Sequence, residues 1–373
     1  MHAPDTYRWH PGADPVKAIW PLVPAFQQDE VISSWLVRCA LAQGCEPSTL
    51  TADVRPSSRF WCFDTDRELS NEWLMALHKL SGLPVEVLEA STLMPLQQKM
   101  TGKAHFPKGL AAWFLCLGTR NRRRCGGLQY CPECFRGQAP HYLVQHRLAW
   151  HTACPIHSVG LLDHCQCCHA PLCPQLIIPP AATLSRCHRC GYELKLAAPG
   201  IAVENAVKFQ NATDDLFAGR LHSYGGRPLM LTEWLSLARW MLAVLRAAAR
   251  AHGPRTEGFF CEMGVRFDGM PPPKIGLPFE YLSPGDRASF LANVWNMIQV
   301  GPDRLIDIAK DMDVRPSLLL PRTTSIPASL YELTSVLQAK RRRQPSSQHH
   351  SATPHSLKSV LMRWHRLLRK FQR

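Results

Sequence analysis

The sequence predicts a mainly helical, multidomain protein whose helical parts flank a cysteine-rich middle region. Its 373 residues suit two or three modest domains. Hydrophobic residues make up 46% of the chain and charged residues 19%, which is the balance of a globular protein with a substantial core. Ten of the fifteen cysteines lie between Cys125 and Cys190. We therefore expect five segments, which are residues 1–19, 20–120, 121–200, 201–335 and 336–373.

The first two segments are expected to be a flexible leader and a helical domain. Residues 1–19 carry three prolines and no periodicity, which is typical of a loose terminus. Residues 20–120 show helical patterns. A first helix is expected from Asp29, because acids open it and apolar residues then recur on one face, and Gly44 is expected to end it.

Two further helices of this domain are separated by a glycine. Ser70 is a suitable N-cap for one helix, which Gly82 interrupts, and Pro84 opens the next. Helix, glycine turn and helix is the order found in a helix-turn-helix unit. An ordinary helical hairpin within a bundle fits the same pattern equally well. The amino-terminal domain is therefore expected to be helix-turn-helix-like.

Residues 121–200 are expected to form a tandem zinc-finger region of the ribbon type. Short Cys-x-x-Cys and Cys-x-x-His knuckles occur in pairs, with nineteen residues between the knuckles of the first pair and eighteen between those of the second. Zinc takes four ligands at roughly 2.0–2.3 Å in a tetrahedron, and two knuckles supply them without strain. We expect two structural zinc ions as cofactors, held by Cys131, Cys134, Cys154 and His157 and by Cys165, Cys168, Cys187 and Cys190.

Two other interpretations of these cysteines are a redox Cys-x-x-Cys motif and chance crowding of buried thiols. The redox motif would need a βαβ setting, and neither alternative accounts for four consecutive knuckles. Since four protein ligands fill each site, no coordination position remains for a catalytic water. The ions are therefore expected to stabilise the fold of this region and to have no catalytic role. Six neighbouring side chains could compete as ligands, namely Cys167, Cys173, His151, His164, His169 and His188.

The carboxy-terminal half returns to helical patterns. Within residues 201–335, a strong helix is expected from Leu231 to Ala251, and a second bihelical, helix-turn-helix-like unit follows at residues 289–320. Residues 336–373 are expected to form a basic linker and a basic amphipathic tail helix.

The charge of the chain predicts an acidic polymer as a partner. The formal net charge is +14, and no acid follows Glu332. Nucleic acid is expected ahead of membrane, although a run of charge is also typical of a solvated loop or tail. The candidate nucleic-acid contacts are Arg120, Arg122, Arg123, Arg124, Lys340, Arg341, Arg342, Arg343, Arg366, Arg369 and Lys370.

The sequence also excludes several classes of protein. The start of the chain lacks the basic and apolar pattern of a signal peptide, and arginines interrupt the most apolar helical stretch, residues 234–251, so we expect a cytoplasmic protein with no membrane partner. The chain holds no GxxxxGK[ST], GxGxxG, HExxH or GxSxG motif. We expect no enzyme activity from this chain alone.

A longer pattern joins the first helix to the metal region. It comprises an acidic pair, a Ser-Ser-Trp-Leu segment with a following arginine, and the two sets of knuckles. This pattern resembles the TniQ family. The residues that carry the resemblance are Pro24, Asp29, Glu30, Ser33, Ser34, Trp35, Leu36, Arg38, Ala40, Tyr130, Cys131, Pro132, Glu133, Cys134, Trp150, Cys154, Pro155, Ile156, His157, Leu161, Leu162, Cys165, Cys168, Leu172, Cys187, Cys190 and Gly191.

The resemblance implies a transposition accessory protein that selects or recruits the target site. It implies an adaptor between a target, either DNA or an RNA-guided CRISPR complex, and an AAA+ ATPase with a separate transposase. It is also compatible with a homodimer and with a bacterial cytoplasmic protein that joins the nucleoid when active. Within the signature, Trp35 and Leu36 are expected to pack, and the eight zinc ligands match the family's two fingers.

Two other functions fit parts of the sequence. A zinc-stapled helix-turn-helix transcription regulator would share the basic charge and both bihelical units. A structural interaction protein would use its fingers to bind protein and its tail only for solubility. Tight binding to a palindromic promoter without a partner would favour the regulator, whereas co-purification with an AAA+ ATPase would favour the adaptor.

Overall fold

A computed structural model of the chain confirms the mainly helical fold, with a single two-stranded sheet among the residues that it describes. Within these residues, no helix combines the length and the apolarity that crossing a membrane requires. The described residues are 19–56, 59–117, 127–180, 183–250, 253–267, 277–312, 316–319 and 326–343, with 357, 361, 362 and 364.

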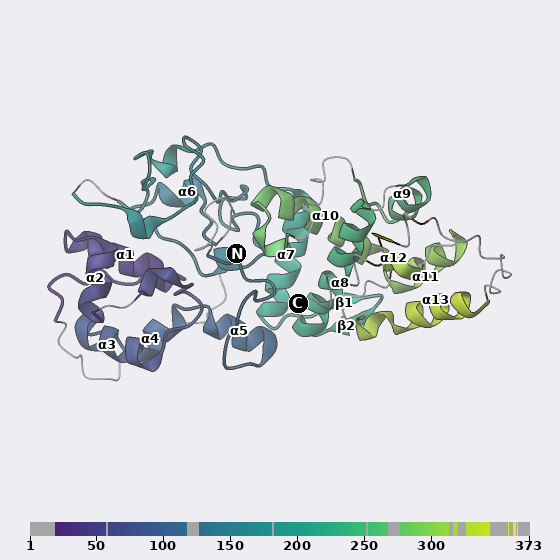
Figure 1. Ribbon diagram of the computed structural model, residues 1–373, viewed down its shortest axis with the longest axis horizontal. Helices are drawn as coiled ribbons and strands as arrows, with labels where there is room; N and C mark the ends of the chain where they lie inside the picture. The colour runs from purple at the N-terminus through teal and green to yellow at the C-terminus, as the bar shows by residue number, and fades with distance from the viewer. Residues whose placement is uncertain are drawn as a thin grey trace.

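The helices between Ile32 and Ala90 form one end of the molecule, and the helix that follows them lies nearer its middle (Figure 1). Trp35, Leu36 and Leu77 are fully buried in the core that the helices between Ile32 and Ala90 share. Ser70 caps its helix as expected, because its side chain accepts a hydrogen bond from the backbone of Trp73, and Gly82 ends that helix in the left-handed conformation. The helices are α1 (Ile32–Ala42), α2 (Pro47–Val54), α3 (Asn71–Ser81), α4 (Val85–Ala90) and α5 (Met94–Thr101), with a 3-10 turn, η1 (Phe60–Cys62).

The predicted start of the first helix at Asp29 was wrong. Asp29 has a φ of 55°, and Glu30 forms an antiparallel bridge with Leu143. The backbone of Val31 donates to Tyr142, so this segment is extended against the middle region and α1 begins only at Ile32. The acids that resemble a helix start therefore belong to a strand-like contact.

The middle region is built from short turns rather than long helices. Isolated antiparallel bridges hold it together, among them Tyr130 with Leu162 and Gly160 with Gly200. Each bridge is a single residue pair, so this region has little regular secondary structure, and the knuckles lie in the turns between the bridges. The named elements are α6 (Pro132–Phe135) and the 3-10 turns η2 (Gln145–Arg147), η3 (Pro174–Leu176) and η4 (Leu194–Leu196).

The long helix α8 buries its apolar face against neighbouring helices, as its amphipathic pattern predicts. The hairpin pairs His222 with Leu229 and Tyr224 with Arg227. The elements are α7 (Glu204–Phe217), β1 (His222–Tyr224), β2 (Arg227–Leu229), α8 (Leu231–Arg250), α9 (Pro254–Cys261), η5 (Phe279–Tyr281), α10 (Pro284–Val300), α11 (Pro302–Asp311), α12 (Pro316–Leu319), η6 (Ala328–Leu330) and α13 (Tyr331–Arg343).

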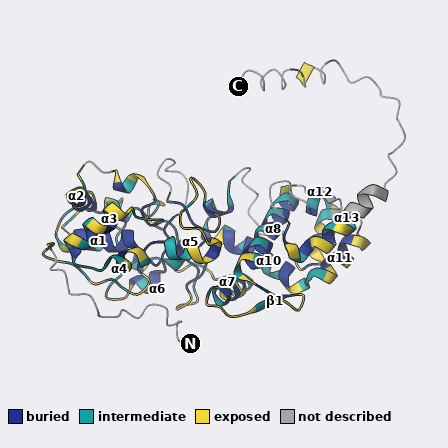
Figure 2. Cartoon of the chain, turned by 90° about the horizontal axis from the view of Figure 1, so that it is seen from below, coloured by how far each residue is buried: buried dark blue, intermediate teal, exposed yellow. Residues whose placement is uncertain are grey.

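The molecule is elongated, with α1–α4 at one end and α9 and α11–α13 at the other (Figure 1). Its largest hydrophobic core lies around α7, α8 and α10 and also takes in Trp113, Phe114, Leu148 and Trp150. Buried residues therefore continue through the interior from the carboxy-terminal helices into the middle region. Much of α11 and α13 faces outward (Figure 2).

Candidate metal centres and the buried polar frame

The first candidate metal centre joins α6 to the loop that follows Trp150. Pro132 opens the single turn of α6 between Cys131 and Cys134. His157 Nδ1 lies 3.6 Å from Cys131 Sγ, 3.3 Å from Cys134 Sγ and 3.5 Å from Cys154 Sγ. The Sγ atoms of Cys134 and Cys154 are 3.7 Å apart. Four donor atoms from two knuckles therefore face a common centre.

The second candidate centre repeats this arrangement with four cysteines. Cys165 Sγ lies 3.6 Å from Cys190 Sγ, and Cys168 Sγ lies 3.7 Å from Cys187 Sγ. In both centres the first residue of each knuckle is buried, whereas the second is half-buried or exposed. Each centre thus has an inner side anchored in the fold and an outer side close to solvent.

The same backbone turn shapes three of the knuckles. The residue four positions after the first ligand donates its N–H to that ligand's carbonyl at 2.9 Å in each case, and its φ is positive. Left-handed backbone lets the chain reverse tightly enough to aim both ligands inward. Glycine supplies this conformation in one knuckle only. The three turn residues are Ser158, His169 and Gly191.

The distances between the donor atoms fit a tetrahedral metal ion and not a disulfide. Zinc with bonds of about 2.3 Å to sulfur and about 2.0 Å to nitrogen would separate its ligand sulfurs by about 3.8 Å and sulfur from nitrogen by about 3.5 Å. A disulfide would place two sulfurs about 2.05 Å apart. In each group all four donor atoms lie within 4.8 Å of one another. The two sets can therefore each hold one metal ion.

The side chains that could have competed as ligands are engaged elsewhere or lie outside the clusters. His151 Nε2 lies 3.0 Å from Asp214 on α7, and His164 Nδ1 lies 2.7 Å from Asp163. Among the described residues, neither group of converging donor atoms includes Cys167, Cys173, His151, His164, His169 or His188.

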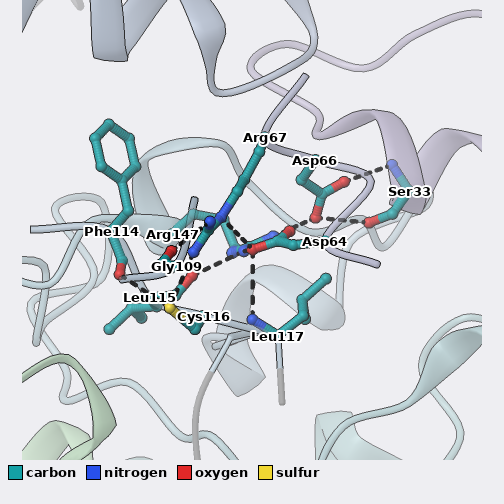
Figure 3. A network of polar contacts seen from close by, with 10 residues as sticks. All are labelled: Ser33, Asp64, Asp66, Arg67, Gly109, Phe114, Leu115, Cys116, Leu117 and Arg147. Carbon is teal, nitrogen blue, oxygen red and sulfur yellow. Dashed lines mark hydrogen bonds and ion pairs between the residues drawn. The ribbon is translucent and has the colours of Figure 1, made fainter. Parts of the chain in front are cut away.

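A buried polar network connects the first helix to the metal region (Figure 3). Ser33 at the start of α1 donates to Asp66 through its backbone at 2.9 Å and its hydroxyl at 3.0 Å. Arg147 donates to Asp66 and, at 2.7 Å, to Asp64. It also donates to the carbonyl of Leu115 at 2.8 Å. One guanidinium thus holds three separate chain segments together.

Burial and charge pairing oppose each other in this network: burial raises the pKa of the Asp66 carboxyl although Arg147 opposes this shift, whereas the carboxylates favour the charged form of Arg147. The Arg147 and Asp66 side chains are fully buried, and Asp64 is nearly so. Burial alone would lower the pKa of Arg147, but the two carboxylates outweigh it and raise this pKa above its usual value. A buried cation with two such partners is costly to leave unpaired. We name Ser33, Asp64, Asp66 and Arg147 the polar frame.

A second buried arginine connects the metal region to the carboxy-terminal helices. Arg287 on α10 donates to the carbonyl of Ala149 and to the side chain of Gln129. Burial lowers the pKa of Arg287 to about 10, so the guanidinium stays charged at neutral pH. The side-chain oxygen of Gln210 on α7 accepts from the backbone of Thr152 at 3.0 Å. The metal region is therefore tied to both neighbours.

The residues of the amino-terminal signature have structural roles. Trp35 and Leu36 are fully buried, as expected for packing. Trp35 stacks on Phe26, with 4.6 Å between ring centroids. Arg38 forms an ion pair with the buried Glu30, whose carboxylate also accepts from Ser34 at 2.8 Å. The signature residues therefore stabilise the interior of the segment that packs beside the metal region.

Sequence reasoning missed the polar frame and Arg287. In the polar frame, Asp66 is 33 residues from Ser33 and 81 residues from Arg147, so no local spacing in the sequence predicts these contacts. The available signal is a charged residue among apolar neighbours, as in His146-Arg147-Leu148-Ala149-Trp150. His146 belongs to the same run, and burial lowers its pKa although a contact with Cys154 opposes this shift.

The side chains of the candidate nucleic-acid contacts lie outside the described residues. Lys340, Arg341, Arg342 and Arg343 lie within α13, but their side chains are outside the described residues. The other predicted contacts lie wholly outside them, namely Arg120, Arg122, Arg123, Arg124, Arg366, Arg369 and Lys370.

Part of the chain is similar to a known protein family. The TniQ family model matches residues 21–161. This stretch contains α1–α5, the whole polar frame and the first metal centre, and it ends before the second. A search of curated proteins found no match to the chain.

Proposed function

We propose, from the premise that residues 21–161 form a TniQ domain, that this protein is an adaptor for transposon target-site selection. At the level of the family, such a domain implies a transposition-associated role in target selection. The adaptor would connect a DNA target or an RNA-guided CRISPR complex to an AAA+ ATPase and, through it, to a transposase. The chain's lack of a phosphate-binding loop fits an ATPase carried by another protein.

We further propose that the two metal centres hold structural zinc. Cys131, Cys134, Cys154 and His157 would bind one ion, and Cys165, Cys168, Cys187 and Cys190 the other. Three thiolates with an imidazole, or four thiolates, are the ligand sets typical of structural zinc. When bound, zinc supplies crosslinks between knuckles that have little secondary structure of their own.

The observation that carries the proposal is that the family signature, the polar frame and the first metal centre form one connected unit. Ser33 joins the signature helix to Asp66. Arg147 donates to the same carboxylate and is preceded along the chain by His146, whose side chain contacts Cys154. Such a unit keeps a surface in fixed shape, which is what an adaptor needs to bind two partners in one geometry.

The alternative of a helix-turn-helix regulator gains little support from the first bihelical unit. A recognition helix normally brings basic or amide side chains to the major groove. The second helix of this unit, α4, instead exposes Glu86 and Glu89 and has no basic residue. Phosphates flanking a groove would repel these carboxylates. The unit is better suited to packing or to a protein partner.

An insertion-mapping assay tests the adaptor function. The chain would be combined with the AAA+ ATPase and the transposase of a transposon, and insertion sites would be sequenced with and without the chain. We expect insertions to concentrate at one target only when the chain is present. A Cys131→Ser variant should lose this concentration, whereas a control at the exposed Cys62, Cys62→Ser, should keep it.

Two results would count against the proposal. One is an insertion pattern that does not depend on the chain. The other is tight binding of the chain alone to a single palindromic promoter, which would favour the transcription regulator.

A further inference from the structure

A basic loop projects from the TniQ domain at the end of α5. We name residues 102–110 the lysine loop, which connects α5 to Ala111. Nearly all of its residues are exposed, including Lys103, His105 and Lys108. Lys99, in the last turn of α5, is also exposed and lies over the ring of Phe217, with 5.0 Å from Nζ to the ring centroid. The loop is thus a concentrated site of positive charge among the described residues.

The lysine loop is held in place at three points although it is exposed. Gly102 ends α5 in the left-handed conformation, with its N–H bonded to Gln98. Phe106, midway along the loop, meets Phe114 edge-on with 5.0 Å between centroids. The Arg67 guanidinium donates to the carbonyl of Gly109 at 2.7 Å. Lys103 and Lys108 therefore extend from a backbone that is already ordered.

Few negative charges oppose these lysines. Glu68 is the acid nearest the loop, where it accepts from the backbone of Phe106 at 3.4 Å and lies 3.9 Å from His105. Among the described residues, no ion pair involves Lys103 or Lys108. An exposed lysine without a carboxylate partner is free to neutralise a phosphate.

The base of the loop is connected to the polar frame. Arg67, which holds Gly109, also contacts Asp64 at 3.3 Å and donates to Cys116 Sγ at 3.1 Å. Asp64 in turn accepts from Arg147 of the frame. Arg67 therefore links the lysine loop to the polar frame through Asp64. This connection gives the loop a fixed position relative to the rest of the domain.

We propose that Lys103 and Lys108 form a sequence-independent phosphate-contacting surface for duplex DNA. The inference rests on the proposed function, in that it gives the adaptor a way to hold the DNA beside its target. Ordered backbone lowers the entropic cost of binding. Lysines that neutralise phosphates release counterions, so their contribution must fall as salt rises. The surface carries no pattern of amide or guanidinium groups that would read bases.

A salt titration of a double variant tests the surface. Full-length, metal-loaded protein carrying Lys103→Gln and Lys108→Gln would bind a random 30-base-pair duplex across a range of NaCl concentrations, followed by fluorescence anisotropy. We expect several-fold weaker binding at low salt and a log-log slope smaller by about 1.8, since each contact contributes about 0.9. The Lys103→Glu and Lys108→Glu pair should bind more weakly still.

A matched control removes the same charge elsewhere. Lys79 on α3 and Lys310 on α11 are exposed, and the Lys79→Gln and Lys310→Gln pair should leave the slope within error of the unchanged protein. Circular dichroism and metal content confirm that each variant is folded. A lysine-loop variant with unchanged affinity and slope would overturn the proposal.

Two further measurements separate the alternatives. Loss of binding to poly-L-glutamate with unchanged DNA binding would assign the surface to an acidic protein instead, and would also overturn the proposal. The insertion-mapping assay reports the adaptor function independently. Intact target choice with an unchanged salt slope rejects only the lysine surface, whereas a reduced slope with chain-independent insertion rejects only the adaptor function.

Discussion

Single buried side chains decide how the segments of this protein meet. Arg147 has no exposed surface, yet it reaches two carboxylates of one chain segment and a carbonyl of another. Removing one partner of a buried charge network leaves the others without compensation. The free energy of unfolding should therefore be more sensitive to this arginine than to any exposed one.

Replacing Arg147 with methionine should lower the free energy of unfolding by about 3–5 kcal/mol, because Asp64 and Asp66 would remain buried without their cation. Urea denaturation followed by tryptophan fluorescence measures this loss. Arg59 is exposed, so Arg59→Met serves as a control and should change stability by less than about 0.5 kcal/mol. A loss for Arg147→Met as small as that of the control would show that the network contributes little.

The metal ligands are the second set of single residues with large effects. Gently purified protein should contain two zinc ions per chain by mass spectrometry, and Cys131→Ser should reduce this to about one. Chelation should unfold the middle region and leave the outer helices partly formed, because the knuckles have little other structure. Circular dichroism follows the remaining helix content. Less than one zinc per chain in the unchanged protein would refute the assignment.

At the scale of elements, the protein contrasts capped helices with turns held by isolated bridges. Ser70 and Ser283 each cap a helix through a side-chain hydrogen bond. The middle region depends instead on close backbone approaches. The hydrogen bonds between Gly160 and Gly200 measure 2.8 and 3.2 Å. This bridge fastens the chain after the second metal centre to the first.

Gly160→Ala should disrupt this bridge. An added Cβ would lie 2.7 Å from the carbonyl oxygen of Ile201 and 2.8 Å from the carbonyl carbon of Gly200, so the backbone would have to move. We expect a loss of about 1–3 kcal/mol, as for other overpacked sites, and faster proteolysis within residues 150–200. Thermal unfolding and limited proteolysis measure the two effects.

Gly285 near the start of α10 provides the matched control, since an added Cβ there meets no atom within 4 Å. Gly285→Ala should be neutral or slightly stabilising. If both glycine variants behave alike, the close approach at Gly160 does not constrain the region.

At the scale of the whole molecule, the two helical ends are joined through the metal region. Arg287 and Gln210 reach it from α10 and α7, and Ser33 reaches it from α1 through Asp66. The basic charge of the chain, in contrast, is concentrated near the end of the sequence. Ten basic residues and no acids occur from Lys340 to Arg373.

Deleting residues 340–373 should weaken binding to random duplex DNA and flatten its salt dependence. Each lost phosphate contact should reduce the log-log slope by about 0.9. A full-length chain with the ten basic residues changed to glutamine keeps the tail length and should reproduce the deletion. Affinity and slope equal to those of the full chain would show instead that the tail serves only solubility.

The sequence by itself determined the features that are coded locally. Knuckle spacing singled out the eight side chains that converge in the two centres. Ser70 and Gly82 marked the two ends of α3, and the order of motifs identified the TniQ resemblance, which the family model confirms over residues 21–161. Each of these signals lies within a few residues or in a fixed order along the chain, so each feature can be predicted from the sequence without knowledge of the tertiary contacts.

Tertiary structure alone decided the features that join distant segments. Asp29 looked like a helix start, but its backbone is left-handed, with a φ of 55°, and residues 29–31 pair with residues 142–144. Hydrogen bonds of the polar frame join residues that are as many as 83 positions apart, and Arg67 fixes the lysine loop at Gly109, 42 residues away. Such contacts depend on which surfaces the packed cores bring together, and sequence spacing does not encode that arrangement.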